Sequence, residues 1–409
     1  MNYIQRDLER KFLKSDGFFK AVLVTGARQV GKTTMLRHLA KKQNRTYISL
    51  DDIGARDLAK RDPELFFQMY KPPIIIDEVQ YAPEIFPTIK ILCDESDQTG
   101  QFWLTGSQQF NMMENVRESL AGRISILELF SFSMREIESI SYNDELDFSL
   151  DGLKKREMYT PKKDITSIFD YIWHGGMPQI IQADAEERQD YWSAYVNTYL
   201  MRDAAELGGV TDTLRFGKFL KACAALIGEQ LNYKTLADAA EIAQSTASQW
   251  IKLLQGMGII YLLYPFSNNA LKRLAKTPKI YFYDSGLAAN LSMWPSSVTL
   301  MNGPASGHYF ENFVITQMAR NYVYSPNKAN LSYYRDQNAK EIDLIIEVNR
   351  SVHPIEIKKS ARPDYREIKK FDVLNKTALN RGAGGIVCLA QSIQPIDSLN
   401  CFIPCNLIL

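Results

Sequence analysis

The feature that most constrains the fold is a glycine-rich segment between an apolar run and a helical one. Residues 21–25, AVLVT, form a short apolar run of β-prone side chains, which predicts a buried strand. The segment GARQVGKTT follows, and MLRHLAKK then shows a helical pattern. Glycine at positions 26 and 31 permits backbone angles that other residues resist. The sequence therefore predicts a strand, a glycine loop and a helix in that order.

This loop matches the phosphate-binding pattern GxxxxGK[ST] at every fixed position. Consecutive N–H groups at the start of a helix can turn inward around phosphate oxygens. Lys32 is expected to neutralise the β- and γ-phosphates, and the Thr33 hydroxyl is expected to ligate Mg²⁺. The alternative is a glycine turn with no phosphate role. ATP and Mg²⁺ are the expected cofactors, and the predicted ATP-contacting residues are Gly26, Ala27, Arg28, Gln29, Val30, Gly31, Lys32, Thr33 and Thr34.

A second apolar run, PIIIDEV, ends in two carboxylates. A carboxylate at a strand end can reach the magnesium shell, so Asp77 is the expected metal ligand and Glu78 is expected to orient or deprotonate the attacking water. The next apolar run, FWLTGS, ends in Thr105 and Ser107. Either hydroxyl can contact the γ-phosphate or the water, or it can cap a turn instead.

The first third of the chain alternates strand and helix patterns. The expected strands cover 21–25, 46–51, 73–79 and 101–107, and helical patterns cover 54–70 and 84–97. This alternation is typical of a parallel sheet wrapped by helices. The predicted fold class is α/β, with a P-loop NTPase sheet over residues 1–145.

The middle of the chain is expected to be helical. A helical lid region is predicted over 146–230, and the order helix, turn, helix, strand, loop, strand predicts a winged-helix segment over 231–290. Residues 231–280 carry a local excess of four positive charges, and small polar side chains at 244–249 open the expected recognition helix. DNA contact, a structural role and protein docking all stay open for this segment.

The last segment, 300–409, is predicted to be a small α/β domain. If Asn349 and Arg350 form a two-residue hairpin turn, Asp343 lies opposite Glu356 on the facing strand. Two like charges in that arrangement are destabilising, and a divalent cation between them would remove the penalty. The alternative is an exposed hairpin in which Glu341 and Lys358 form a surface ion pair.

The motifs GARQVGKTT, IIIDEVQ, LTGS and SLAGR, in this order, resemble those of prokaryotic AAA-type ATPases with a carboxyl-terminal region of unknown function. The resemblance extends over the whole chain, through GGMP at 175–178 and YLMRD at 199–203. It implies an arginine that acts as a finger on a neighbouring subunit's nucleotide. Arg123 is the first candidate and Arg117 the second, and a homo-oligomer is an open expectation. The predicted catalytic residues of the ATP site are Glu78, Lys32, Arg123 and Ser107.

The carboxyl-terminal segment resembles the PD-(D/E)xK nuclease core, which has an Asp on one strand and ExK on the next. The resemblance implies that Asp343 and Glu356 hold Mg²⁺ and that Lys358 positions or activates water as the catalytic lysine. Glu311, on the preceding helix, would complete the metal shell. The Pro-Asp of that core is replaced here by Ile342-Asp343.

The charge and the apolar content of the chain limit whether it can bind DNA or a membrane. The chain has 48 Lys plus Arg against 47 Asp plus Glu, so DNA would have to be bound by a local patch. No uninterrupted apolar run of about 18 residues is present, and the charged start MNYIQRDLERKF does not suit a signal peptide. A cytoplasmic protein with no membrane partner is therefore expected. The five scattered cysteines are predicted to be reduced core residues.

Together these features predict a Mg²⁺-dependent ATPase coupled to a nuclease-like domain that acts on or binds DNA. The alternative is an ATP-controlled binding switch whose carboxyl-terminal domain is catalytically inactive and docks a protein or DNA. The expected partners are therefore ATP and either DNA or a protein.

Overall fold

A five-stranded parallel sheet is the centre of the first of two structural units. In the computed structural model, residues 3–41, 43–106, 116, 119–140, 146–267 and 277–409 are described. Unit 1 contains Met1–Phe132 and Gly256–Ile259, and unit 2 contains Ser133–Gln255 and Ile260–Leu409. The four segments predicted from the sequence divide the chain more finely than these two units.

The sheet of unit 1 has the strand order β2-β3-β4-β1-β5, and all its neighbours pair in parallel. Its strands are β1 (Ala21–Thr25), β2 (Thr46–Ser49), β3 (Ile74–Asp77), β4 (Phe102–Thr105) and β5 (Ile124–Glu128). Strands β1 to β4 lie within the predicted ranges, whereas β5 was not anticipated. Because the strands are parallel, the phosphate loop after β1 and the carboxylates after β3 emerge at the same edge.

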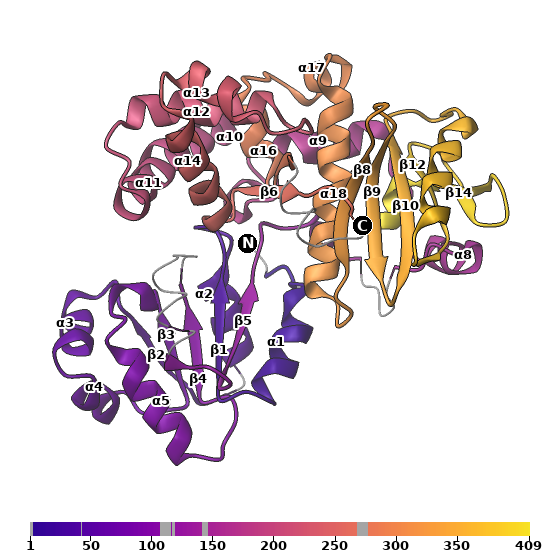
Figure 1. The fold of residues 1–409 in the computed structure, drawn as a ribbon. Coiled ribbons are helices and arrows are strands. Elements are labelled where there is room, and N and C mark those ends of the chain that lie inside the picture. The colour runs from indigo at the N-terminus through magenta and orange to yellow at the C-terminus, as the bar shows by residue number, and fades with distance from the viewer. Residues whose placement is uncertain (1–2, 42, 107–115, 117–118, 141–145, 268–276) are drawn as a thin grey trace. The chain divides into compact units, whose positions relative to one another are not determined.

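Helices cover both faces of this sheet, with α3, α4 and α5 on one side and α1 on the other (Figure 1). The helices of unit 1 whose bounds the structure describes are α1 (Leu8–Asp16), α2 (Lys32–Ala40), α3 (Ile53–Arg61), α4 (Pro63–Met69), the short η1 (Val79–Tyr81) and α5 (Ile85–Glu95). The single helix expected over 54–70 is two helices. The Asp62 side chain accepts a hydrogen bond from the Leu65 N–H, and Pro63 occupies the first turn, so a new helix begins there.

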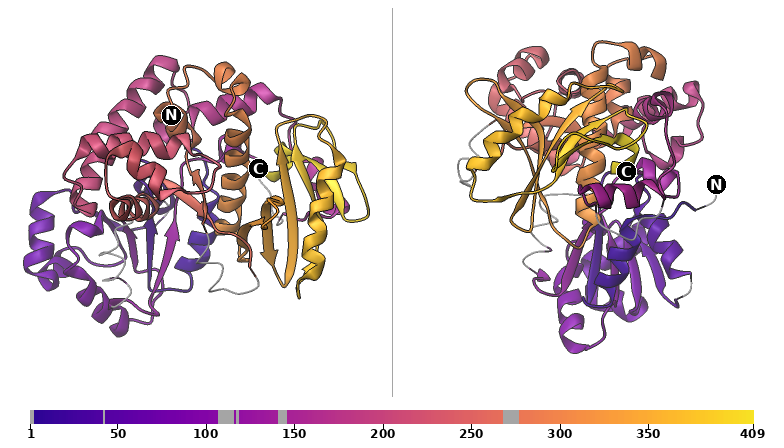
Figure 2. Two further views of the ribbon diagram at one scale, coloured as in Figure 1. Left: turned by 45° about the horizontal axis from the view of Figure 1, so that its top comes forward. Right: turned by 90° about the vertical axis from the view of Figure 1, so that its right-hand side faces the viewer.

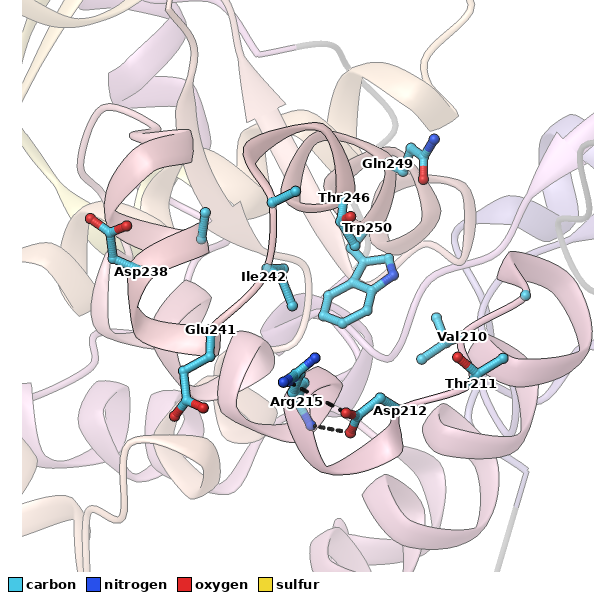
Figure 3. A pocket seen from close by; sticks show the side chains of 13 residues that line it. Val210, Thr211, Asp212, Arg215, Asp238, Glu241, Ile242, Thr246, Gln249 and Trp250 are labelled. Atoms are coloured by element: carbon cyan, nitrogen blue, oxygen red, sulfur yellow. Dashed lines mark hydrogen bonds and ion pairs between the residues drawn. The ribbon is translucent and has the colours of Figure 1, made fainter.

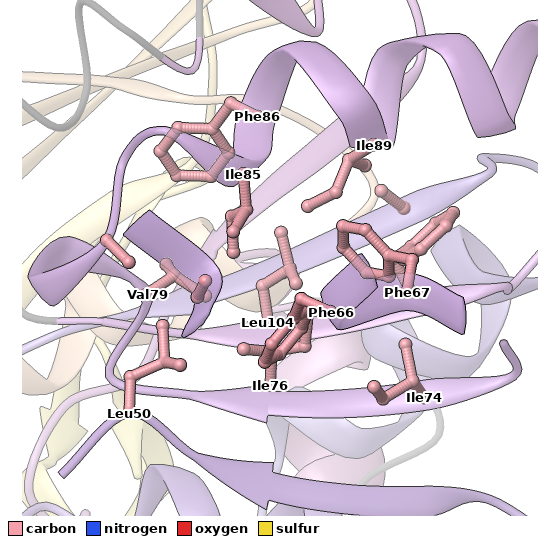
Figure 4. Close-up of a cluster of buried hydrophobic side chains, with 14 of the residues drawn as sticks. Leu50, Phe66, Phe67, Ile74, Ile76, Val79, Ile85, Phe86, Ile89 and Leu104 are labelled. Carbon is pink, nitrogen blue, oxygen red and sulfur yellow. The ribbon is translucent and has the colours of Figure 1, made fainter. Parts of the chain in front are cut away.

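The two faces of the sheet bury different side chains. On one face, Phe66 and Phe67 of α4 and Ile85 of α5 pack over Ile76 and Leu104 of the central strands (Figure 4). On the other face, the ring of Phe12 in α1 meets Trp103 edge to face, with centroids 4.8 Å apart. The three central strands β1, β3 and β4 are therefore buried on both faces, as their continuous apolar runs predict.

The first half of unit 2 is helical, in agreement with the predicted patterns. Its elements before the last sheet are α7 (Met134–Ile137), α8 (Leu150–Glu157), α9 (Ile165–His174), η2 (Pro178–Ile180), α10 (Ala185–Ala194), the π-helical η3 (Tyr195–Leu200), α11 (Met201–Gly208), α12 (Thr213–Ala225), α13 (Tyr233–Ala240), α14 (Gln244–Gly256), α16 (Ser285–Leu291) and α17 (Ser297–Asn302). Strands β6 (Ile260–Leu263) and β7 (Lys279–Phe282) follow α14 and pair antiparallel, as the sequence predicts.

A mixed seven-stranded sheet forms the end of unit 2. Its main path runs β13-β14-β12-β10-β9-β8, and β11 pairs with β10. The long helix α18 (Ser306–Tyr324) packs along β10 (Figure 2), and the helix expected near 365–378 is the 3₁₀ helix η4 (Tyr365–Lys376). The strands are β8 (Asn330–Arg335), β9 (Glu341–Val348), β10 (Ser351–Lys358), β11 (Asn380–Arg381), β12 (Gly384–Cys388), β13 (Gln394–Pro395) and β14 (Asn400–Pro404), and η5 (Cys405–Ile408) follows.

The hairpin between β9 and β10 has the predicted register. Asn349 and Arg350 have φ angles of 49° and 62°, which suits a two-residue turn that matches the strand twist. Ser351 pairs with Val348, and the ladder continues in register to Ile355 and Leu344. The observed pairs confirm the predicted hairpin register, and Glu356 and Asp343 are the residues that directly follow the last of them.

Two composition-based expectations concern burial. The five cysteines, Cys93, Cys223, Cys388, Cys401 and Cys405, are all buried, which confirms them as core residues. Within the described ranges, no helix combines the length and the apolar character that crossing a membrane requires.

Candidate functional site

The glycine loop has the backbone geometry that its sequence predicts. Gly26 has φ 138°, and a Cβ at this position would overlap the Leu129 carbonyl. Gly31, with φ 95°, is the left-handed residue that precedes helix α2. Both glycines are therefore required by conformation, and the loop leads directly into the first turn of α2.

Lys32 lies over this loop and is buried. Its Nζ donates hydrogen bonds to the carbonyl oxygens of Gly26, at 3.1 Å, and Ala27, at 2.9 Å. The ammonium group is thus held at the place where the pattern puts phosphate.

Arg6 is hydrogen-bonded to the glycine loop. The sequence did not indicate this contact. It is 3% exposed and donates to the carbonyl oxygens of Val30, at 2.8 Å, and Phe130, at 2.6 Å. Its guanidinium also lies 4.1 Å from the centroid of the Phe132 ring. The arginine lies in a polar stretch far before the loop, so no local pattern indicates this role.

The two predicted magnesium ligands are adjacent. The Thr33 hydroxyl donates to Oδ1 of Asp77 at 2.7 Å, and the Tyr47 hydroxyl donates to Oδ2 at 3.1 Å. Burial, with the charge of Asp77 adding to it, raises the pKa of Tyr47 to about 12, so this hydroxyl stays a donor at neutral pH. The hydroxyl of Thr33 and the carboxylate of Asp77 therefore form a pair at the start of α2.

Glu78 has a backbone conformation that non-glycine residues rarely adopt. Its φ and ψ are 58° and 47°, in the left-handed region. The Glu78 N–H donates to the Thr105 hydroxyl at 3.1 Å, and that hydroxyl donates to Asp77. Thr105 thus fixes both carboxylate residues, and the side-chain amide of Gln80 donates to the Glu78 carboxylate. Such strained conformations are concentrated at functional sites.

Three other predicted residues remain, and only Arg123 is described by the structure. Ser107 and Arg117 lie outside the described residues. Arg123 directly precedes β5, and its carbonyl accepts from the N–H of Ala21 at the start of β1, whereas the phosphate loop follows the end of β1. Its guanidinium pairs with both oxygens of Asp94, at 2.5 and 3.0 Å. Arg123 is therefore at the opposite edge of the sheet from its own chain's phosphate loop, and the finger role on a neighbouring copy stays a prediction.

The carboxyl-terminal sheet holds a second group of ionisable residues. Glu356, only 1% exposed, accepts from Lys358 at 2.8 Å and from Lys370 at 2.5 Å, both at its Oε1. Its Oε2 is buried and has no hydrogen-bond partner among the residues that the structure describes. Asp343 accepts from the backbone N–H of Ile357 at 2.8 Å through Oδ2.

Glu311 of α18 belongs to the same electrostatic group. Its Oε1 accepts from Lys279 at 2.9 Å and from the hydroxyl of Tyr281 at 2.6 Å. Burial and the charge of Asp343 raise the pKa of Glu311 to about 7, and the same two causes raise the pKa of Glu356 to about 8. In the described part of the chain, no three His, Cys, Asp or Glu side chains are close enough together to hold a metal ion as they stand.

The alternative prediction, a surface ion pair between Glu341 and Lys358, is wrong. Glu341 pairs with Lys279 at 2.6 Å and with Arg335 at 3.0 Å, and Lys358 pairs with Glu356. Burial lowers the pKa of Lys279, but the charges of Glu311, Asp343 and Glu341 outweigh it and raise the pKa above its usual value. Lys279 therefore stays charged.

The expected recognition helix borders a pocket of about 630 Å³ (Figure 3). Thr246 and Gln249 of α14 line it. Its charged lining residues are Arg215, Asp212, Asp238 and Glu241. Asp212 pairs with Arg215 and Glu241 pairs with Lys218, so the charged lining offers no cluster of free cations for phosphate.

The basic residues that gave the segment 231–280 its positive charge are not gathered on α14. Lys272, Arg273 and Lys276 lie outside the described residues. Lys279 is buried in ion pairs, which leaves Lys234 and Lys252 exposed. The described part of this segment therefore offers little attraction for a nucleic-acid backbone.

Comparison with known proteins divides the chain into three matched segments. Residues 18–138 match the model of an AAA domain. Residues 165–298 and 306–408 match two domains of unknown function, DUF8612 and DUF4143.

Relatives match the chain over most of its length. An uncharacterized protein of Mycobacterium tuberculosis, Rv2008c, is 30% identical over 345 residues, which cover 84% of this chain and 71% of the relative. MJ1637 of Methanocaldococcus jannaschii, also uncharacterized, is 25% identical over 82% of this chain and 74% of its own. Among solved structures, the Walker-type ATPase PABY2304 of Pyrococcus abyssi aligns with a TM-score of 0.42 and 16% identity, over 71% of this chain and 96% of that one. The chain therefore belongs to the same family as Rv2008c, and its first unit is an AAA-type P-loop ATPase domain.

Proposed function

We propose that unit 1 binds ATP with Mg²⁺ and hydrolyses it. The observation that carries this proposal is the 2.7 Å hydrogen bond between Thr33 and Asp77, beside a loop whose two glycines have left-handed conformations. These two side chains supply the hydroxyl and the carboxylate that a magnesium ion beside a triphosphate requires. Mg²⁺, when bound, would neutralise charge on the β- and γ-phosphate oxygens.

The protein groups around the triphosphate have separate roles in this proposal. The loop N–H groups donate to the phosphates at the amino end of α2, where the helix dipole also favours negative charge. Lys32 moves its hydrogen bonds from the Gly26 and Ala27 carbonyls to phosphate oxygens. Glu78, fixed through its N–H by Thr105, accepts a proton from the attacking water.

Removing the divalent ion tests this proposal. We expect phosphate release from ATP to fall by at least about 100-fold when EDTA is added. Without the metal ion, the negative charge on the β- and γ-phosphate oxygens is no longer neutralised during hydrolysis. Excess Mg²⁺ should restore the rate, which separates metal removal from damage to the protein. Turnover that continues unchanged in EDTA would contradict the proposal.

We also propose a second function, metal-dependent phosphodiester cleavage by the carboxyl-terminal sheet. The observation in its favour is a pattern shared by Glu311, Asp343 and Glu356. Each has one carboxylate oxygen held by donors of the chain itself, and the structure records no hydrogen bond from a described residue to the other oxygen. For Glu356 that second oxygen is also buried.

The oxygen ligands of these three carboxylates are of the chemical type that a hard divalent cation takes. Carboxylate oxygens are the ligands that Mg²⁺ prefers. Burial raises the pKa of Glu311 and Glu356, the charge of Asp343 raises both further, and a cation near Asp343 would offset that second cause. In this proposal Lys358, 2.8 Å from Glu356, orients the attacking water. The carboxylates do not form a metal-holding group as they stand, so this proposal requires their side chains to be rearranged when the cation binds.

The replacement of Asp343 by asparagine tests the second function. We expect cleavage of single- or double-stranded DNA with Mn²⁺ or Mg²⁺ to fall by at least about 100-fold, because the variant loses a ligand charge but keeps the side chain's shape. The matched control is Asp336→Asn, in the loop before β9. If the parent protein cleaves no DNA under any of these conditions, the alternative is favoured instead. In that alternative the protein is an ATP-controlled switch whose carboxyl-terminal domain docks DNA or a protein.

A further inference from the structure

We infer that Gln80 is a positioning residue for ATP hydrolysis, which orients the Glu78 carboxylate toward the attacking water. The inference rests on the proposed ATPase function and deepens it, because it assigns a role to a residue that the phosphate-loop and strand-end patterns leave out. Two observations carry it: the hydrogen bond between these two side chains, and the burial of the glutamine's other polar atom.

The Gln80 side chain contacts the Glu78 carboxylate directly. Its Nε2 donates a hydrogen bond to Oε2 of Glu78. Because an ionised carboxylate only accepts hydrogen bonds, the amide nitrogen has to face Glu78, and the orientation of the amide is fixed. The structure records no hydrogen bond from a described residue to Oε1 of Glu78. One carboxylate oxygen is therefore held, and the other can accept from water.

The backbone after β3 brings the two side chains together. In a regular helix, side chains two residues apart point to different sides. Glu78 instead has a left-handed conformation, and the short helix η1 follows it directly. The Tyr81 N–H donates to the Glu78 carbonyl at 3.1 Å, and Val79 is fully buried in the core of unit 1 (Figure 4). The turn is thus fixed on both sides of Gln80, and it holds the amide beside the carboxylate.

The other end of the Gln80 amide argues against a structural role. Its Oε1 is buried and has no hydrogen-bond partner within the described ranges. A buried polar atom in that state costs free energy, and an apolar side chain of similar size would avoid this cost. The recorded hydrogen bond of the Gln80 side chain goes to Glu78. The contact therefore serves the carboxylate rather than the stability of the fold.

Hydrolysis requires a carboxylate that points in one direction. The water oxygen forms a bond to the γ-phosphorus while the bond to the ADP oxygen breaks, and Glu78 takes one proton from the water. With Oε2 held by Gln80, rotation of the carboxylate is restricted and Oε1 is presented to the water. The loss of a hydrogen bond to a charged group corresponds to about 10- to 100-fold in rate when the contact acts in the transition state.

The experiment is the replacement of Gln80 by methionine, which has a side chain of similar length but no donor for Glu78. We expect kcat for ATP hydrolysis to fall by about 10- to 100-fold, with KM within about twofold of the parent, because the contact orients the base and does not touch the nucleotide. The melting temperature should equal or exceed that of the parent, since the buried oxygen without a partner is removed. The matched control is Gln68→Met, at an exposed position of α4, which should keep the parental kcat and KM.

A double variant tests whether Gln80 acts through Glu78. When Gln80→Met is added to Glu78→Gln, single-turnover hydrolysis should fall further by less than about twofold, because the carboxylate that Gln80 positions is already gone. If Gln80→Met lowers the rate by the same factor in this background as in the parent, the two residues act independently and the inference is overturned.

The remaining outcomes separate the inference from the proposed function. Parental kcat in a folded Gln80→Met protein overturns the inference and leaves the ATPase function intact. A lower melting temperature together with weaker ATP binding shows a structural role and also overturns it. A parent protein that hydrolyses no ATP overturns the ATPase function and the inference together. If Gln80→Met does not fold, Gln80→Glu applies the same kinetic test, because it keeps the shape of the side chain and, when ionised, has no hydrogen to donate.

Discussion

Replacing Glu78 by glutamine is expected to reduce ATP hydrolysis by about 100-fold or more while ATP still binds. The carboxylate is the expected proton acceptor for the attacking water, and such groups contribute about 10²- to 10⁴-fold. Glutamine keeps the size of the side chain and can still accept from Gln80. Steady-state phosphate release and equilibrium binding of labelled ATP measure the two effects separately.

The matched control for this variant is Glu84→Gln. Glu84 is exposed and immediately precedes α5. Its hydrolysis rate should equal that of the parent. If Glu78→Gln hydrolyses ATP within about threefold of the parent, Glu78 does not have the role of proton acceptor.

The replacement of Lys32 by methionine is expected to weaken ATP binding by about 100-fold or more. Methionine preserves much of the apolar stem but removes the ammonium group. The loss of one buried charge-assisted contact costs about 3 kcal/mol, which corresponds to about two powers of ten in affinity. Displacement of a fluorescent ATP analogue measures the change.

The control for this variant lies on the same helix. Lys41 caps the carboxyl end of α2 and is exposed, so Lys41→Met should bind ATP as the parent does. Because Lys32 also donates to two loop carbonyls, thermal melting should accompany the measurement. A folded Lys32→Met protein with parental ATP affinity would rule out a phosphate contact by this lysine.

Local sequence patterns predicted the parts of the molecule whose geometry is determined locally. Gly26 and Gly31 are required by backbone conformation, so their spacing predicts the loop. The β9–β10 register was predictable because Asn349 and Arg350 form a two-residue turn, which fixes every later pair. The Asp77–Thr33 contact follows from parallel strands that end at one edge.

The contacts that the sequence did not predict join segments far apart in the chain. Arg6 reaches Phe130, and Tyr47 reaches Asp77, through tertiary packing that no local spacing encodes. Lys279 was assigned to a basic patch, but its ammonium is buried between Glu311 and Glu341. A basic residue in a β-prone run can face solvent or a buried carboxylate, and only the folded chain distinguishes the two.

Titration calorimetry of the parent chain with ATP and Mg²⁺ tests the central claim most directly. The loop geometry, the buried Lys32 and the Thr33–Asp77 pair predict saturable heat with one nucleotide per chain. The same titration of Lys32→Met should give no saturable heat over the same concentration range. An absence of heat from the folded parent, with ATP and with ADP, would contradict the account.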